Sequence, residues 1–407
     1  MLTPSIETRS SWIVASVSVA LLATSFGALW ITAVGLKSIA ADLGGARSAP
    51  SLASSLAWLG SSVGGVMMGR FADWYGIRWT VIFGAVAVCI GLFISTLGTP
   101  WQLYVGHGVF MGLLGNAGLN APLYVYVSRW FDRRRGSALA LIASGGYIAG
   151  SVWPPIFERA IEHFGWRYTM IAYGIFAVAF IVPLALIFLR APPELPTLGA
   201  DSAAAGATPK VFGWPPNVVF ALLAGASFLC CVTMSMPQAH LVALCTDLGI
   251  SASHGAAMLS LLLGIGFFSR QGWGVISDRI GGLRTLLISS VLQATAMTAF
   301  VLTQDEAGLF AVAGAFGIGF SALIPAYVLA VREYFPAREA GWRVPALMLM
   351  SGSGMAAGTW LAGVLYDYFG YYAPAFAAGV AFNLLNLVVL VTLMARHRYA
   401  SSVVTPA

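Results

Sequence analysis

Twelve apolar stretches, each close to the length of a helix that crosses a bilayer, run through almost the whole sequence. A membrane-spanning helix needs about 20 predominantly apolar residues. The stretches fall at about residues 12–36, 50–69, 79–98, 101–128, 137–158, 167–189, 217–241, 254–276, 285–303, 307–331, 343–366 and 372–395. The segment between the sixth and seventh, 191–213, is rich in Pro, Ala, Gly and Thr, and we expect a flexible linker there. The pattern predicts an all-α, polytopic membrane protein with twelve transmembrane helices in two six-helix halves, residues 1–190 and 214–407.

The composition excludes an ordinary soluble domain. Hydrophobic residues make up 59% of the chain and charged residues 9%, whereas soluble domains carry roughly 25% charged residues. The net charge of +6 does not indicate nucleic-acid binding, because the basic residues lie in short turns. The four cysteines lack the spacing of metal sites or disulfides, and no nucleophile, histidine and acid arrangement is visible. We therefore expect no metal, no other cofactor and no enzymatic activity.

Basic residues are distributed unevenly between the two sides of the predicted bundle. If both termini share one side, that side receives sixteen of the 21 Lys and Arg residues, and the other receives only Lys37, Arg47, Arg159 and Arg167. Cytoplasmic loops carry an excess of basic residues, so we expect cytoplasmic termini. No small-residue cleavage signal follows the first stretch, which we interpret as an uncleaved span. Only two of the 21 basic residues are lysines, which favours a GC-rich bacterium and its cytoplasmic membrane.

The two halves share a turn with the same order of glycine, aspartate and arginine. Its residues are Gly69, Asp73, Gly76 and Arg78 in the first half and Gly274, Asp278, Gly281 and Arg284 in the second. The leading glycines are 205 residues apart (274 − 69). Glycine permits tight turns, and the aspartates could cap a helix start or pair with an arginine. We expect the turns to act as gates that hold one half-bundle shut.

The stretch GRFADWYGIR at 69–78 resembles the signature of the major facilitator superfamily between spans two and three. The resemblance implies two halves related by an axis along the membrane normal, with a substrate site between them near the bilayer midplane. Most of the chain also resembles the monocarboxylate transporter and oxalate/formate antiporter group of that superfamily. This resemblance is carried by SRWFDRRRGSALALIASGGYIAG (128–150), HLVALCTDLGISASHGAAMLSLLLGIGFFSRQGWGVISDRIGG (240–282) and GLKS (35–38).

The sequence differs from this group at three places that affect the expected proton coupling and the expected class of substrate. The acidic, tryptophan-rich opening of span one in animal members is reduced to Trp12. Gly266 stands where animal members carry an aspartate, one turn before the arginine of span eight. Span eleven has SGSGM at 351–355 where oxalate antiporters carry a lysine. The missing lysine argues against a dicarboxylate, which would favour two cations.

Arg270 lies inside a predicted span, where a charge costs roughly 2.5–3.5 kcal/mol on insertion scales and marks a functional site. Every aspartate and glutamate falls in a turn or near a span end, so no acid is available at that depth. A substrate carboxylate is the expected partner, because a guanidinium group binds it through two parallel hydrogen bonds. Alternatively, Arg270 extends toward water or Asp278.

Other polar residues are candidates for binding or coupling. Asn120, Tyr124, Tyr147 and Tyr327 could hydrogen-bond a substrate oxygen, or could instead join neighbouring helices. Lys37 at the outer end of span one is either an entry-site cation or a solvated helix-end charge. The histidines of spans four and seven, which titrate near working pH, either carry the coupling proton or have a structural role. These histidines are His107 and His240.

Together these features predict a secondary transporter of small monocarboxylates such as lactate or pyruvate, working by proton symport and alternating access. Its partners would be the organic anion, protons and the lipid bilayer, and we expect a functional monomer. The alternative is an exchanger of organic anions without proton coupling. A membrane-bound carboxylate sensor is disfavoured, because it would need a cytoplasmic partner-binding domain and the linker and tail are short. Multidrug efflux is disfavoured, because it would favour an acidic residue in the cavity in place of the lone arginine.

Overall fold

The computed structural model describes residues 7–191 and 211–404, and its regular elements there are helices. In the first half these are α1 (Arg9–Val34), α2 (Leu36–Asp42), α3 (Ser48–Tyr75), α4 (Ile77–Ser95), α5 (Pro100–Val105), the π-helix η1 (Gly106–Asn116), α6 (Ala117–Ser128), α7 (Arg135–Ala143) and α8 (Gly145–Phe188). In the second half they are α9 (Pro216–Asp247), α10 (Ala252–Ile280), α11 (Gly282–Leu302), α12 (Glu306–Phe320), α13 (Leu323–Tyr334), α14 (Ala337–Phe369) and α15 (Ala373–Val404).

These helices make the twelve predicted crossings. Helix α8 contains two of them, because Gly165 adopts non-helical angles (φ 79°, ψ 160°) and turns the chain back. Single crossings are built from α5, η1 and α6, and from α12 and α13. Within the described residues, nine helical segments are long and apolar enough to cross a membrane, and one of these is the double segment 136–188. Helix α3 and the crossing of α5, η1 and α6 complete the twelve, which confirms the predicted fold class.

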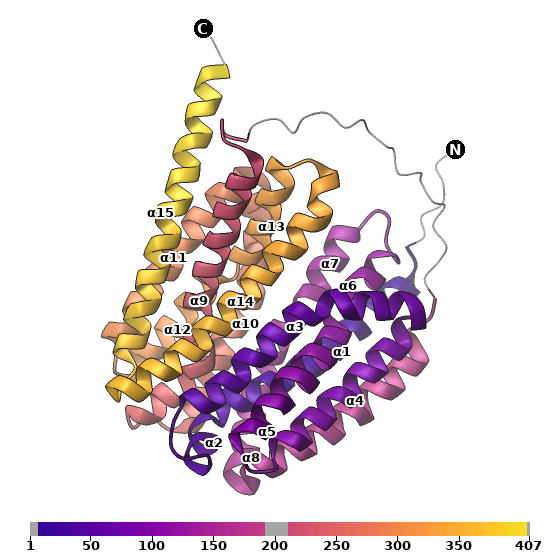
Figure 1. Ribbon diagram of the computed structural model, residues 1–407, viewed down its shortest axis with the longest axis vertical. Coiled ribbons are helices and arrows are strands. Elements are labelled where there is room, and N and C mark those ends of the chain that lie inside the picture. The colour runs from indigo at the N-terminus through magenta and orange to yellow at the C-terminus, as the bar shows by residue number, and fades with distance from the viewer. Residues whose placement is uncertain (1–6, 192–210, 405–407) are drawn as a thin grey trace.

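The chain forms two helical bundles side by side, α1–α8 and α9–α15 (Figure 1). The bundles lie apart at the end where both termini emerge and come together at the other end. We call the first end the terminal face. We call the second the latch face; it carries α2 and the loops that follow α9, α11 and α14. Helices α3 and α14 pack against each other across the two halves, as do α8 and α10.

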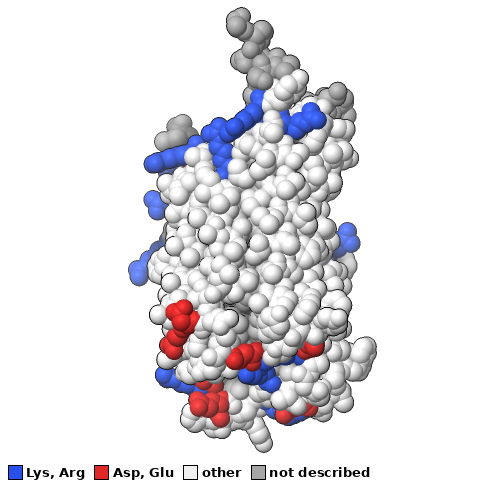
Figure 2. All heavy atoms as spheres, turned by 90° about the vertical axis from the view of Figure 1, so that its left-hand side faces the viewer, with Lys and Arg blue, Asp and Glu red and all other residues white. Residues whose placement is uncertain are grey.

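Charged side chains are concentrated at the two ends of the molecule. On the side shown in Figure 2, Lys and Arg gather at the terminal face, while acidic and basic side chains mix at the latch face. A broad band between them is almost free of charge. Such a band matches the hydrocarbon core of a bilayer, about 30 Å thick. The charge pattern and the helix lengths describe a multi-pass membrane protein.

The repeated turn has the same backbone conformation in both halves. Gly76 joins α3 to α4 with φ 81° and ψ 157°, and Gly281 joins α10 to α11 with φ 82° and ψ 164°. Both angles lie in a region that only glycine enters readily, so the sequence spacing did identify a structural repeat. Arg78 Nε donates to the Leu189 carbonyl, 3.1 Å away, inside the first half. Glu333 accepts from the Gly282 N–H, 3.0 Å away, inside the second.

Most of the predicted linker, residues 192–210, lies outside the described residues. Its last residues, 211–213, are anchored on the second half. The Phe212 ring lies 4.6 Å from the Tyr334 ring and 5.0 Å from the His397 ring, measured between centroids. Val211 and Trp214 form a short antiparallel bridge. Residues 211–213, which the sequence assigned to a flexible linker, are therefore packed against the second half.

Candidate functional site

A cavity of about 780 Å³ lies between the two halves. Its walls come from α1, α3, α6, α7 and α8 on one side and from α9, α10, α11, α12, α13 and α14 on the other. At its inner end it reaches Trp30 and Gln238, and toward the terminal face it reaches Ser277 and Arg332. The cavity thus runs from the middle of the bundle toward the end where the two halves lie apart (Figure 1).

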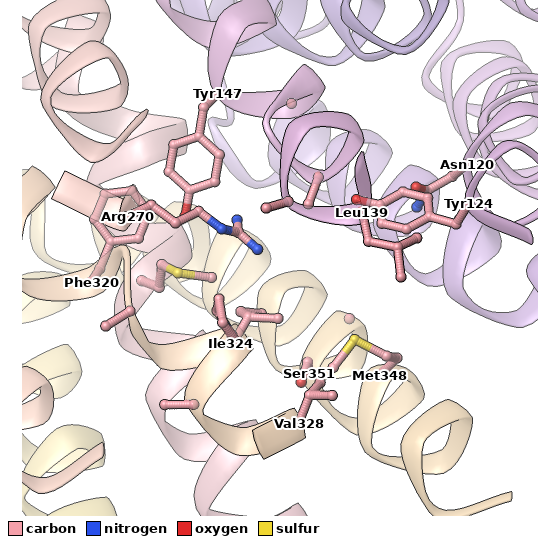
Figure 3. Close-up of a pocket in the computed structure, with 18 of the residues that line it drawn as sticks. Asn120, Tyr124, Leu139, Tyr147, Arg270, Phe320, Ile324, Val328, Met348 and Ser351 are labelled. Atoms are coloured by element: carbon pink, nitrogen blue, oxygen red, sulfur yellow. The ribbon is translucent and has the colours of Figure 1, made fainter. Parts of the chain in front are cut away.

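Arg270 extends from α10 into this cavity (Figure 3). Its guanidinium carbon lies 5.2 Å from the centroid of the Tyr147 ring, within the range of a cation–π contact. Tyr147 in turn stacks on Phe320, with centroids 5.7 Å apart and planes 9° apart. No aspartate or glutamate in the described part of the chain forms an ion pair with Arg270. The cavity therefore contains a cation held by aromatic side chains and not by an acid.

The space one helical turn before Arg270 is occupied by Tyr147. A Cβ atom added to Gly266 would lie 2.9 Å from Tyr147 Cε1 and 3.3 Å from Phe320 Cζ. An aspartate at this position, expected from the resemblance, would collide with the ring that now contacts Arg270. Glycine at position 266 therefore leaves room for the Tyr147 ring, which contacts Arg270 where the resemblance predicts an acid.

Across the cavity from Arg270, α6 contributes Asn120 and Tyr124 (Figure 3). The remaining wall is largely apolar. Its apolar side chains include Leu139, Ile324, Val328 and Met348. Among the residues that line the cavity, only Arg270 and Arg332 carry a charge. The arrangement can hold an anionic head at Arg270, offer hydroxyl and amide groups to its oxygens, and pack an apolar part against the walls.

Tyr327 and His107 are buried between helices, away from this cavity. Tyr327 is fully buried, and its hydroxyl donates to Asn386 Oδ1 at 2.8 Å, between α13 and α15. His107 is also fully buried, with Nε2 2.8 Å from Thr32 Oγ1 and Nδ1 2.8 Å from Ser95 Oγ. The structure brings neither residue to the group around Arg270.

His240 and Lys37 lie at the latch face, not in the main cavity. His240 is fully buried, 3.0 Å from the Tyr372 hydroxyl and 2.9 Å from the Thr359 carbonyl oxygen. Its Nε2 is also 3.4 Å from Ser51 Oγ of α3, in the other half. Lys37 Nζ lies 3.0 Å from Asp247 Oδ1, an ion pair between the first and second halves.

Sequence reasoning missed the residues that close the latch face. Arg47 binds Asp247 through both terminal nitrogens. The Asp367 carboxylate accepts from the backbone N–H groups of Arg47 and Ser48, 2.7 and 2.9 Å away, at the start of α3. The sequence indicated only that Arg47 is one of four basic residues on the side of the bundle opposite the termini. Its partners are 200 and 320 positions away, so no local pattern could have revealed them.

The predicted gating residues lie at the opposite end. Gly76 and Gly281 place Asp73, Arg78, Asp278 and Arg284 on the terminal face. Among the ion pairs of the described residues, none includes these four side chains. These residues would act as a gate in a conformation in which the terminal face is closed. Their gating role therefore stays a prediction.

A comparison with known protein families shows to which family the chain belongs. The family description "Major Facilitator Superfamily" matches residues 17–306 and 223–406, which together cover nearly the whole chain. The chain belongs to the Major Facilitator Superfamily. This assignment and the twelve helical crossings of the described residues confirm the predicted fold.

Relatives within the Major Facilitator Superfamily are diverse. The chain is 26% identical to the MFS-type transporter pynF of Aspergillus niger over 245 residues, which are 58% of this chain and 55% of that protein. It is 24% identical to monocarboxylate transporter 13 of Bos taurus over 346 residues, 84% of this chain and 79% of that one. The chain thus spans little more than half of the fungal relative's length.

Solved structures of the superfamily have the same fold. A bacterial homolog of the human lysosomal transporter Spinster, in an inward-facing and occupied conformation, superposes with a TM-score of 0.70. That comparison covers 97% of this chain and 98% of the other, at 17% identity. In this superfamily the substrate site lies between the two halves, which is where the cavity around Arg270 is found.

Proposed function

We propose that this superfamily member transports small monocarboxylates such as lactate or pyruvate by proton-coupled symport. The observation that carries the proposal is Arg270, a cation in the cavity between the halves without an acidic partner among the described residues. A guanidinium group in a low-dielectric site favours a bidentate carboxylate. The similarity to monocarboxylate transporter 13 supports membership of that group.

In the proposed mechanism, Arg270 binds the substrate carboxylate while Tyr147, Tyr124 and Asn120 donate hydrogen bonds to its oxygens. The apolar wall then holds the short carbon chain. Binding neutralises the charge of Arg270, which lowers the cost of enclosing it as the two halves rock and close the terminal face. Tyr327 is not part of this proposed site, because its hydroxyl is already bonded to Asn386.

The proposed setting follows from the charge distribution. The terminal face, rich in Lys and Arg (Figure 2), would face the cytoplasm of a bacterial cell, and the latch face would face outward. The conformation described above is then the inward-open one. We propose that a single chain is the transporting unit, because both halves that enclose the cavity belong to the same chain.

The test is uptake into proteoliposomes loaded with a pH-sensitive dye. Acidification after addition of lactate, pyruvate or related acids should be faster with the wild-type protein than with Arg270→Ala. The variant controls for passive entry of the undissociated acid. Arg332→Ala is a matched control, since it removes the other cation of the cavity. If the wild-type rates coincide with Arg270→Ala for every acid, proton symport of these acids is refuted.

An exchanger of two organic anions is the second candidate, favoured by one observation. Within residues 7–191 and 211–404 no acidic side chain lines the main cavity, so these residues offer no carboxylate to carry a proton back when the cavity is empty. An unneutralised Arg270 would then hinder the return of the empty carrier. An exchanger would transport labelled acid only into vesicles preloaded with a counter-substrate. Uptake into empty vesicles at the same rate would exclude obligatory exchange.

A further inference from the structure

A second cavity, of about 360 Å³, opens at the latch face. It lies where the ends of α1 and α2 and the fifth crossing in α8 face α9 and the start of α10 in the other half. Its rim is exposed at Lys37, Glu162 and Ser253, so water from that side of the membrane reaches it. The cavity is separate from the one around Arg270, and nothing in the proposed substrate site uses its residues.

Glu158 forms part of the wall of this cavity and is only 8% exposed. Its carboxyl group has no hydrogen-bond or ion-pair partner among the described residues. Burial without partners disfavours an ionised carboxylate. Glu162, one turn further along the same helix, lines the same cavity and repels a charge on Glu158. Glu158 is therefore suited to hold a proton in this conformation.

Among the described residues that line this cavity, Lys37 is the only cation, and it pairs with Asp247 of the other half. Lys37 thus pairs with one carboxylate, Asp247, and lines the same cavity as two others, Glu158 and Glu162. Asp247 ties it to the second half, whereas Glu158 and Glu162 belong to its own half. Its side chain is 43% exposed, so it is free to change partner. An ionised Glu158 would attract Lys37 away from Asp247, and a protonated Glu158 would not.

Two carboxyl groups of the described residues line this cavity, and Glu158 is the buried one, whereas Glu162 is exposed to water. On α8, burial and the charge of Glu162 oppose the ionised form of Glu158 more strongly than Arg159 and His163 favour it. On α9 and α10 the cavity walls are uncharged. Beyond those walls, Asp247 is bound to Arg47 and Lys37, and His254 is bound to Glu306 at 2.7 Å. Helix α1 has no titratable side chain after Arg9, and α4 none near this end except Cys89.

We infer that Glu158 is a proton-binding site at the latch face that controls how firmly the latch is closed. With a proton on Glu158, Lys37 stays on Asp247 and the two halves remain joined. When the proton leaves to water, Lys37 is drawn toward Glu158, its pair with Asp247 weakens, and the latch opens more readily. The inference rests on the proposed alternation between two open states, and it extends that proposal to a pH-sensitive outer gate.

The experiment measures latch opening directly and needs no substrate. A single cysteine is placed at Ser55, which is buried behind the latch and donates to the Ala356 carbonyl of the other half. The background has the four native cysteines replaced by alanine. The purified protein is labelled with a maleimide from about pH 5 to about pH 8, a range that includes the titration of a buried carboxyl group. Rates are normalised to Gln304→Cys, an exposed loop position, to remove the pH dependence of the thiol itself.

The normalised rate should rise by about two- to fivefold with pH, the size expected when an exposed ion pair changes partner. Glu158→Gln, which mimics the protonated form, should remain slow at every pH, and Lys37→Met should also lose the pH dependence. Glu162→Gln is the matched control and should keep it. A flat wild-type profile, an unchanged profile in Glu158→Gln, or an equal loss in Glu162→Gln would each overturn the inference. Because no substrate is present, any of these results leaves the carboxylate proposal standing.

Discussion

Arg47 and Asp247 join the two halves through a two-pronged ion pair, with Nη1 to Oδ2 and Nη2 to Oδ1 distances of 2.6 Å each. The guanidinium group also lies over the Tyr366 ring, 3.6 Å from its centroid. Its side chain is only 8% exposed. This arrangement keeps the latch face closed while the cavity extends toward the terminal face. In the proposed alternation the start of α3 separates here from the end of α9, which carries Asp247, so the pair would break in every cycle.

Asp247→Asn should therefore shift the protein toward a conformation that is open at the latch face. The variant leaves Arg47 without its carboxylate, and we expect the closed latch to lose about 2 kcal/mol. Pulsed electron-spin distances between labels at Leu97 and Gln304, in the two halves at this face, should lengthen. Asp42→Asn is the control, because Asp42 pairs with Arg167 inside one half. Equal distances in Asp247→Asn and the wild type would show that the ion pair does not hold the latch.

The sequence predicted those features of the fold and the site that depend on neighbouring residues alone. The repeated turn was recognisable because positive φ angles require glycine at fixed spacing, and Arg270 because a charge inside an apolar span has few explanations. The latch could not be predicted from the sequence, because Arg47, Asp247 and Asp367 meet only when the two halves pack together. Tyr327 was a candidate because its hydroxyl lies within a span and could bond a substrate oxygen. An apolar span does not reveal which of its faces lines a cavity, and the Tyr327 hydroxyl bonds Asn386 instead.

Replacement of Arg270 by lysine should separate charge from geometry. Lysine retains the positive charge but lacks the planar fork that binds both carboxylate oxygens. We expect KM for the transported acid to rise about tenfold or more, whereas Arg270→Gln should abolish saturable uptake. Initial rates of labelled-acid uptake measure both effects. A lysine variant with wild-type KM would show that only the charge matters.

Introduction of an acid at Gly266 should impair binding through Tyr147. In Gly266→Asp, the new side chain displaces the Tyr147 ring, whose Cε1 would otherwise lie 2.9 Å from its Cβ. The carboxylate can then pair with Arg270 one turn away and compete with the substrate. Gly266→Ala separates the steric effect from the charge. We expect KM to rise in both variants and more in the aspartate; an aspartate no worse than alanine would exclude competition for Arg270.

The packing of α14 offers a test of latch closure that involves no charge. A Cβ on Gly363 would lie 2.6 Å from Ser51 Oγ and 3.0 Å from the Arg47 carbonyl oxygen, both in the other half. Gly363→Val should therefore push the halves apart at the latch face and slow transport. At Gly358 a Cβ would instead lie 2.1 Å from the Val232 carbonyl oxygen, within the second half. Gly358→Val should lower the melting temperature without selectively opening the latch, as reported by the Leu97 and Gln304 labels. Identical behaviour of the two variants would contradict this assignment.

Two tyrosines should respond differently to loss of the hydroxyl group. Tyr327→Phe removes the bond to buried Asn386 and should destabilise the protein by about 1 kcal/mol with KM unchanged. Tyr124→Phe removes a hydroxyl from the wall of the cavity and should raise KM severalfold, with little effect on the melting temperature. Melting curves and initial uptake rates of both variants, reconstituted alike, separate the two roles. If Tyr327→Phe raised KM and Tyr124→Phe did not, the substrate would bind closer to α15 than the cavity around Arg270 allows.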